Sequence, residues 1–345
     1  MAEEKKIKKL SIFLRIVIAL LIILVLIVGV AFFYVKGKLD KIQRVELPSD
    51  EDLGITETTA QNLTGYRNIA IFGVDSRSDD YGVGNRSDCI IIASINNDTG
   101  AIKLISVYRD TYVNIEGHGL DKITHAYSFG EAPLAIKTLN TNLDLNINEF
   151  VTVNFDSVAE AVDQLGGVQL TITADEIKYI NGYIDETSRV TGKTSAHITQ
   201  PGTYTVDGVQ AVSYSRIRYT DGGDYKRTER MRTVIEAMFS KLKTKSITEI
   251  NSFADKILPH VYTNISATDI LTMVPSMSKY KVTESIGWPY DTKGKTMDRW
   301  YGIPITLESN VIQLHKEAFG EEDYTPSDTV KSISASIVKK TGYTK

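Results

Sequence analysis

The chain has 345 residues, of which 42% are hydrophobic and 24% are charged, and its formal net charge is −4. This composition is ordinary for a globular protein of one large or two small domains, and the acidic balance excludes the broad basic field of a nucleic-acid-binding protein. The single cysteine, Cys89, excludes a disulfide framework, a CxxC motif and a cysteine-rich zinc site, and its position beside three isoleucines is typical of a small strand residue.

An uncharged apolar run covers residues 16–33, eighteen residues in all. As a helix it is long enough to cross the hydrocarbon core of a bilayer. The alternative is a secretory signal peptide, whose apolar region would be about 7–15 residues long and would end at a small-residue cleavage site. This run ends in Phe32, Phe33 and Tyr34, which suit the aromatic belt of a membrane interface. We therefore predict an uncleaved transmembrane helix over residues 16–35.

Basic residues lie on both sides of the apolar run, so charge alone does not orient it. Size is decisive, because a short N-terminal tail stays inside the cell while a long trailing domain is translocated regardless of its charge. We predict a cytoplasmic tail over residues 1–15, an extracellular stalk over the polar residues 36–64, and a globular part outside the cell membrane.

The globular part begins with strands. Apolar runs predict strands over residues 68–75, 88–95 and 101–108, and the turn-forming residues 96–100 predict an antiparallel hairpin between the last two. Further elements follow along the chain, namely a helix over 133–143 and strands over 149–155 and 168–172.

Three helices follow from capping and periodicity. Ser157 with Glu160 is a capping-box pattern, and that helix ends at the glycines 166–167. Asp207 with Gln210 is a second capping pattern, which opens a helix towards residue 216. The apolar residues of 227–242 recur at helical spacing, so they form the core face of an amphipathic helix.

Strands and helices in this mixed order predict a layered α/β domain. We place it over residues 65–245. Residues 246–345 hold both tryptophans and are less regular, apart from a helix start at residues 325–328. We predict that they form a C-terminal subregion packed on the main domain.

Two aspartates stand at strand ends around a glycine-containing loop. Asp75 ends the first strand and Asp88 begins the second, so their carboxylates can lie side by side. Two close carboxylates repel unless a cation or a proton lies between them, and oxygen ligands suit Mg²⁺. The alternative is that both carboxylates bond the backbone N–H groups of the loop. Arg109 and Asp110 follow the third strand, where such a pair usually closes a turn.

A cluster of basic residues lies within seventeen positions, opposed by Asp221, Asp224 and Glu229. Its members are Arg216, Arg218, Lys226, Arg227, Arg230 and Arg232. Arginines at the start of the helix that follows are unfavourable for the helix dipole, and they make sense if an anion docks there. The planar guanidinium binds phosphate oxygens in a bidentate manner. The alternative is a solvated basic surface.

Common enzyme motifs are absent from the sequence, which has no GxSxG, HExxH or P-loop pattern. The five histidines are scattered without metal-ligand spacing, and a structural or surface role is the simpler interpretation for each of them.

The order of these motifs resembles the LytR-CpsA-Psr (LCP) family. The resemblance rests on the N-terminal apolar segment, NIAIFGVDSR, RSD, YRD and the run VDGVQAVSYSRIRYTDGGDYKRTERMR, and it covers roughly residues 66–245. It implies an α-β-α domain with a mixed central sheet and a wall-polymer ligase. Such enzymes move a glycopolymer (teichoic acid, capsule or secondary wall polysaccharide) from a polyprenyl diphosphate carrier to peptidoglycan and release polyprenyl phosphate.

The resemblance also implies roles for single residues. Asp75 and Asp88 match the aspartates that hold Mg²⁺ (or Mn²⁺). The positions that match diphosphate-binding arginines are Arg86, Arg109, Arg216, Arg218 and Arg227, to which Arg230 is added with a weaker assignment, as is Arg77. Asp224 matches an acidic residue of the same site, and Asp75, Asp88 or Asp224 is expected to take the proton of the attacking hydroxyl. Arg109 belongs to the same catalytic group.

One position departs from the family pattern. The residue after Arg230 is commonly glutamine in the family, and here it is Met231, which cannot donate a firm hydrogen bond to phosphate. Other functions remain open: a hydrolase that cleaves the diphosphate with water, a lipid-binding sensor, or a membrane-bound transcriptional attenuator. The last requires the arginine-rich domain inside the cell.

Overall fold

The computed structural model describes residues 43–76, 81–266, 273 and 276–344, and only the backbone at residues 43, 44 and 247. The predicted membrane helix and Arg77 lie outside these residues. No helix within them is long and apolar enough to span a membrane.

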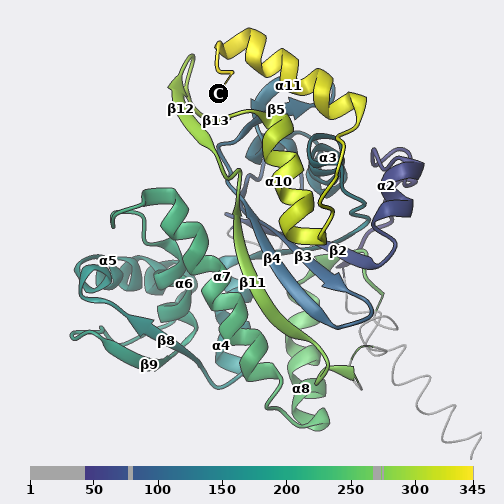
Figure 1. Cartoon of the computed structure of the whole chain (residues 1–345). Coiled ribbons are helices and arrows are strands. Elements are labelled where there is room, and N and C mark those ends of the chain that lie inside the picture. The colour runs from purple at the N-terminus through teal and green to yellow at the C-terminus, as the bar shows by residue number, and fades with distance from the viewer. Residues whose placement is uncertain (1–42, 77–80, 267–272, 274–275, 345) are drawn as a thin grey trace, which may run out of the picture.

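The described chain contains runs of strands and runs of helices as well as alternating elements (Figure 1). The strands are β1 (Gln43–Arg44), β2 (Tyr66–Val74), β3 (Ser87–Asn96), β4 (Ala101–Val107), β5 (Tyr112–Ile115), β6 (Gly119–Lys122), β7 (Glu149–Asn154), β8 (Val168–Ile172), β9 (Gly202–Val206), β10 (Tyr262–Thr263), β11 (Lys281–Trp288), β12 (Thr292–Thr296) and β13 (Trp300–Pro304). The α-helices are α2 (Glu57–Asn62), α3 (Thr124–Leu143), α4 (Phe155–Gln164), α5 (Ala174–Thr191), α6 (Gly208–Arg216), α7 (Gly223–Leu242), α8 (Ile247–Ile257), α10 (Leu307–Phe319) and α11 (Asp328–Thr341), with a 3-10 turn at Leu258–His260.

Seven strands form the central sheet in the order β1-β10-β7-β2-β3-β4-β11. The predicted hairpin is confirmed, since β3 and β4 pair antiparallel with Ile95 opposite Ile102. The sheet is mixed, because β2 pairs parallel with β7 and antiparallel with β3. The antiparallel pairing brings the end of β2, the start of β3 and the end of β4 to the same end of the sheet.

The two faces of the sheet are covered by different helices. Ile90 and Ile92 of β3 point into the core shared with α3, α10 and α11. Ile91 and Ala93 point to the opposite face, where Met231 of α7 packs against them. Because alternate residues of a strand face opposite sides, both faces are buried, and the predicted layered α/β fold with a mixed sheet is confirmed.

The C-terminal residues are part of this sheet. Strand β11 pairs parallel with β4 along its length, and β10 pairs with β7 near the other edge. The boundary that we placed at residue 245 therefore crosses the sheet, and residues 246–345 complete the domain as well as packing on it. Helix α11 begins at the predicted position, with Ser327 as its N-cap.

Three helices begin earlier than the sequence predicted, and one of them is α3, whose first residues precede non-helical backbone at Gly130 and Glu131. Helix α4 is capped by Asn154, whose capping-box partner is Ser157, so Ser157 lies inside the helix. Helix α7 begins at Gly223, because Gly222 adopts the left-handed conformation (φ 89°) that glycine tolerates. The first turn of α7 then contains Asp224, whose negative charge suits the positive end of the helix dipole.

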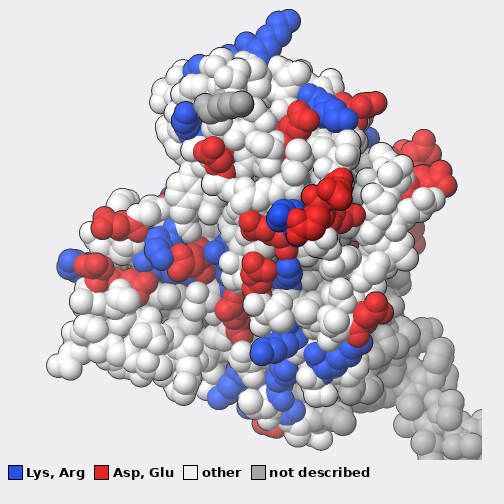
Figure 2. All heavy atoms as spheres, in the orientation of Figure 1, with Lys and Arg blue, Asp and Glu red and all other residues white. Residues whose placement is uncertain are grey.

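A smaller layer lies beside the sheet and carries α5, α6 and the hairpin β8–β9 (Figure 1). Its apolar core is formed by residues such as Leu170, Ile180 and Val209. The predicted capping box of Asp207 and Gln210 is present and starts α6, which ends at Arg216. On the face in Figure 2, acidic and basic side chains are intermixed across the middle of the molecule, and several basic side chains lie together below them.

Candidate functional site

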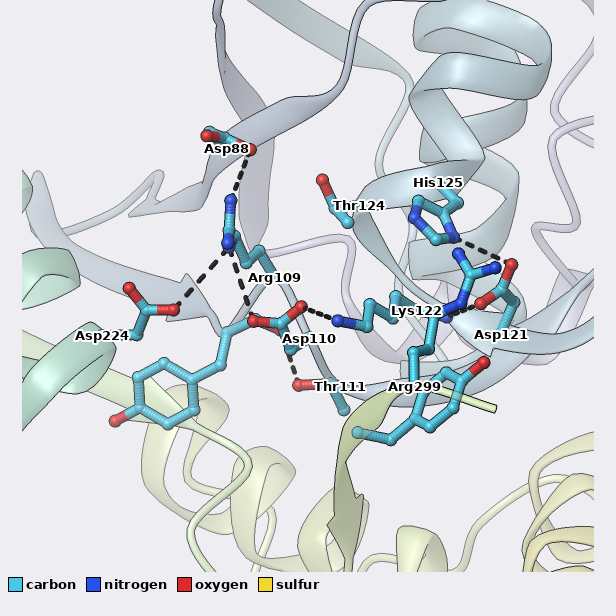
Figure 3. Close-up of polar contacts among 12 residues, drawn as sticks. Asp88, Arg109, Asp110, Thr111, Asp121, Lys122, Thr124, His125, Asp224 and Arg299 are labelled. Atoms are coloured by element: carbon cyan, nitrogen blue, oxygen red, sulfur yellow. Dashed lines mark hydrogen bonds and ion pairs between the residues drawn. The ribbon is translucent and has the colours of Figure 1, made fainter. Parts of the chain in front are cut away.

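Asp88, Arg109 and Asp224 meet where the start of β3, the end of β4 and the first turn of α7 converge (Figure 3). Arg109 donates from Nη1 to Asp88 Oδ1 at 2.8 Å. Its Nε lies 3.4 Å from Asp110 Oδ2 and 3.8 Å from Asp224 Oδ2. Asp110 also pairs with Lys122 at 2.7 Å. The predicted turn-closing pair of Arg109 and Asp110 is thus present, and Arg109 also reaches the two aspartates of the cluster.

Arg218 and Arg227 complete this acid–arginine cluster. Arg218 lies 3.7 Å from both Asp88 Oδ2 and Asp224 Oδ1, and 42% of its side chain is exposed. Arg227 is 3.4 Å from Asp224 Oδ1 with only 2% of its side chain exposed. The loop between α6 and α7 supplies Arg218, and the second turn of α7 supplies Arg227. Counting Asp110 and its partner Lys122, four cations face three carboxylates, so the cluster keeps a positive charge that an additional anion can offset.

Burial and charge act differently on two of these arginines. Burial opposes the charge of Arg109, but the three neighbouring carboxylates outweigh it and raise the pKa of the guanidinium. Burial lowers the pKa of Arg227, and the nearby Arg218 and Arg109 add to that effect. The Nε atom of Arg227 is buried and has no hydrogen-bond partner. A bound anion would stabilise the charge of Arg227.

An open cavity of about 460 Å³ lies beside the cluster and is lined by Asp75, Arg86 and Asp88. Asp75 follows β2 and Asp88 lies in β3, so the sheet brings the two predicted metal ligands to one cavity. Within the described part of the chain, no three His, Cys, Asp or Glu side chains are grouped to hold a metal ion. Two carboxylates completed by phosphate oxygens and water are an arrangement that Mg²⁺ accepts.

Arg216 and Arg230 lie outside the acid–arginine cluster. Arg216 pairs with Glu186 at 2.8 Å, and its guanidinium carbon lies 5.4 Å from the ring of Phe155. Arg230 is buried and pairs with Glu176 at 2.7 Å. Its other nitrogens donate to Ile217 O and Thr220 Oγ1, so the structure gives it the role of holding the α6–α7 loop.

The C-terminal region contributes residues that the sequence did not indicate. Arg299 lines the open cavity, and Trp300 lines a neighbouring cavity of about 300 Å³. Tyr225, Arg109 and Asp224 also line that second cavity. Gly302 donates its backbone N–H to Asp110 O at 2.9 Å, which attaches β13 to the site. No local sequence motif marks these residues. They reach the site because the β12–β13 hairpin contacts residues that are distant in the chain.

An apolar cavity of about 230 Å³ is lined by residues that lie next to members of the cluster in the chain. Its lining includes Cys89, which follows Asp88, and Met231, which lies one helical turn after Arg227. Ile71 of β2, Val158 of α4 and residues of α8 complete it. Met231 therefore faces an apolar space, where a thioether fits better than an amide.

The LytR_cpsA_psr family model matches residues 32–304. The polyisoprenyl-teichoic acid–peptidoglycan teichoic acid transferase TagT of Bacillus subtilis (strain 168) is 29% identical over 305 residues, which cover 85% of this chain and 91% of TagT. TagU of Bacillus licheniformis carries the corresponding transferase name and is 32% identical over 229 residues, 66% of this chain and 68% of TagU. The solved structure of the family protein YwtF (TagT) with bound octaprenyl pyrophosphate lipid has a similar fold, with a TM-score of 0.52 and 23% identity, covering 81% of this chain and 92% of that chain.

Proposed function

The chain belongs to the LytR_cpsA_psr family, and we propose that it transfers a glycopolymer from a polyprenyl diphosphate carrier to peptidoglycan and releases polyprenyl phosphate. The observation that carries this proposal is the acid–arginine cluster, whose Asp88 lines an open polar cavity while the adjoining Cys89 lines an apolar one. A diphosphate that links a sugar to a lipid fits this arrangement, with the sugar in the polar cavity and the lipid in the apolar cavity. The transferase names of the relatives supply the reaction class.

The arginines bind the diphosphate and stabilise the charge that grows on the leaving phosphate. Arg109 and Arg227 are held in place by carboxylates and by burial, so little reorganisation is needed when the anion binds. Arg218 is held only by longer ion pairs and is free to close on the phosphates. Phosphoryl transfer relies on such positioning and charge stabilisation.

The apolar cavity is the binding site for the first part of the polyprenyl chain. Each CH₂ group removed from water contributes about 0.8 kcal/mol. Because Cys89 and Met231 adjoin Asp88 and Arg227 in their own elements, the lipid begins where the diphosphate ends.

Asp75 and Asp88 would hold a Mg²⁺ ion, or Mn²⁺, together with oxygens of the diphosphate. The ion would supply Lewis-acid stabilisation of the phosphoryl oxygens. Arg109 restrains the orientation of Asp88, which leaves its second carboxylate oxygen towards Arg218.

The protein acts at the outer surface of the cell membrane in this proposal. Residues 16–35 anchor it, with residues 1–15 in the cytoplasm, and the polar residues 36–64 lead to the domain. Both substrates, a lipid-linked polymer and peptidoglycan, are then available to one tethered site.

The test is the Arg218→Ala variant in a transfer assay with a lipid-linked polymer and peptidoglycan. Because Arg218 is partly exposed and makes only long ion pairs, the variant should fold normally while kcat/KM for transfer falls by about 100-fold or more. Lys226→Ala, which removes an exposed cation of the same segment, is the matched control and should transfer normally.

Normal transfer by Arg218→Ala would contradict the proposal. Release of phosphate by the wild-type protein without labelled wall product would instead indicate a diphosphate hydrolase. Lipid binding with no turnover would indicate a sensor.

A further inference from the structure

The open cavity holds a histidine–aspartate pair besides the groups already described. His125 lies in the first turn of α3, and its Nδ1 is 2.8 Å from Oδ2 of Asp121 in β6 (Figure 3). Both side chains line the cavity that contains Asp75 and Asp88. They are largely buried, with 12% of His125 and 21% of Asp121 exposed. The pair is therefore held in a fixed position beside the proposed substrate site.

We propose that His125 is the general base for the acceptor hydroxyl and that Asp121 is its positioning residue. When the Nδ1–H group donates a hydrogen bond to Asp121, the lone pair of the neutral imidazole lies on Nε2. Within the described residues, Nε2 of His125 has no hydrogen-bond partner. The inference rests on the proposed transfer function and adds a catalytic residue to it.

The aspartates of the acid–arginine cluster are poor candidates for this role. Asp88 accepts a 2.8 Å hydrogen bond from Arg109 and faces Arg218. Asp224 lies within 3.8 Å of three arginines. The oxygens of both carboxylates thus face guanidinium groups and not an incoming hydroxyl. A general base must lie within hydrogen-bond reach of the proton that it takes, with a lone pair aimed at it.

The ring of His125 is restrained from a second side. Phe129, one turn further along α3, lies 5.9 Å from it between ring centroids. His118 stacks on Phe129 at 4.1 Å, which supports the phenyl ring in turn. The remaining charged groups of the cavity are Asp75, Arg86, Asp88 and Arg299. The base thus faces both signs of charge across a space wide enough for a saccharide hydroxyl.

The step balances as follows. The oxygen of the peptidoglycan hydroxyl forms a bond to the phosphorus that bears the glycopolymer, and its proton moves to Nε2 of His125. The bond between that phosphorus and the bridging oxygen breaks, and its electron pair leaves with polyprenyl phosphate. The imidazolium then returns its proton to solvent, which restores the base.

The test compares His125→Ala with the wild-type protein, using a synthetic prenyl diphosphate-linked saccharide as donor and peptidoglycan as acceptor. We expect kcat to fall by about 100-fold or more. Affinity for geranylgeranyl diphosphate, used as a binding probe, should stay within threefold. Added imidazole should restore part of the rate, which a merely structural role would not allow. His125→Asn keeps a donor towards Asp121 and replaces the alanine variant if that one does not fold.

His197→Ala is the matched control, because His197 pairs with Asp185 at the same 2.8 Å but is exposed and lies outside the cavity. Combining His125→Ala with Asp121→Ala should add no further loss, since Asp121 acts through His125. A kcat near that of the wild type, or a loss that imidazole does not restore, would overturn the assignment while leaving the transfer function intact. Failure of the wild-type protein to transfer would overturn the function itself.

Discussion

Arg227 is the most deeply buried cation of the site, and its burial has a consequence for stability. Only 2% of its side chain is exposed, its Nε lies 3.4 Å from Asp224 Oδ1 without a hydrogen bond, and burial lowers its pKa. A buried charge with incomplete hydrogen bonding opposes folding, and an apolar side chain of similar volume is often neutral or stabilising. Asp224 would keep Arg218 as a partner if Arg227 were replaced.

We therefore expect Arg227→Met to keep or raise the melting temperature while weakening the binding of a prenyl diphosphate. Loss of a hydrogen bond to a charged group corresponds to about 1.5–3 kcal/mol, roughly 10- to 150-fold in affinity. Thermal melts and titration with geranylgeranyl diphosphate measure the two effects. A large fall in melting temperature with normal binding would show that Arg227 serves the fold instead.

Asp75 should matter through the metal ion. We expect chelation with EDTA to stop transfer and Mg²⁺ to restore it. In Asp75→Asn the Mg²⁺ concentration for half-maximal transfer should rise by about tenfold or more, because one charged ligand is lost. Asp298→Asn, which changes an exposed aspartate, is the control. Full activity after chelation would contradict the metal assignment.

At the level of residues, the order of the motifs predicted which side chains of the cluster meet. It did not predict contacts to residues that lie outside those motifs. Asp88, Arg109, Arg218, Arg227 and Asp224 were all named from the sequence, and the structure brings them together. The partners that engage Arg230 and His125 are Glu176 of α5 and Asp121 of β6. Neither element carried a recognisable pattern, so the sequence did not indicate these partners.

Among the elements, strands with a clear apolar pattern were predicted to within about two residues. Strand β3 has buried isoleucines on both faces, and its turn to β4 contains strong turn formers. Strand β11 was missed, because most of its first residues are exposed and only its end enters the core. Such an edge strand is fixed by its pairing with β4, which is not encoded locally.

Helices α4 and α7 line the apolar cavity. A larger side chain on its wall tests whether the cavity binds the lipid. Val158 of α4 is half-buried on its wall. In Val158→Phe the ring should displace about two methylene groups of the lipid, which costs about 1.6 kcal/mol, or roughly 15-fold in affinity. The affinity for a donor with a long polyprenyl chain should fall by this factor, and the affinity for a short-chain donor should fall by less.

Val190→Phe on the exposed end of α5 is the control for added aromatic surface. Equal losses for long and short donors in Val158→Phe would mean that the cavity does not hold the lipid.

Across the whole molecule, the C-terminal region is tied to the main domain by buried polar contacts as well as by the sheet. Asp144, which ends α3, is 5% exposed and accepts hydrogen bonds from Tyr324 Oη and from Ser327 N and Oγ. Together with β11, these contacts join the C-terminal region to the main domain at two separate places. The C-terminal hairpin that carries Arg299 and Trp300 is therefore fixed beside the acid–arginine cluster.

The side of the membrane on which this unit lies can be tested with its single cysteine. Burial raises the pKa of the Cys89 thiol to about 12, and the side chain faces the apolar cavity, so a charged maleimide should not label it even at moderately alkaline pH. Ser336 on α11 is exposed, and Ser336→Cys therefore supplies one reactive thiol. In intact cells a membrane-impermeant maleimide should label Ser336→Cys and leave the wild-type protein unlabelled, because the proposed function places the domain outside the cell. Labelling that appears only after lysis would place the domain in the cytoplasm and contradict the proposed reaction.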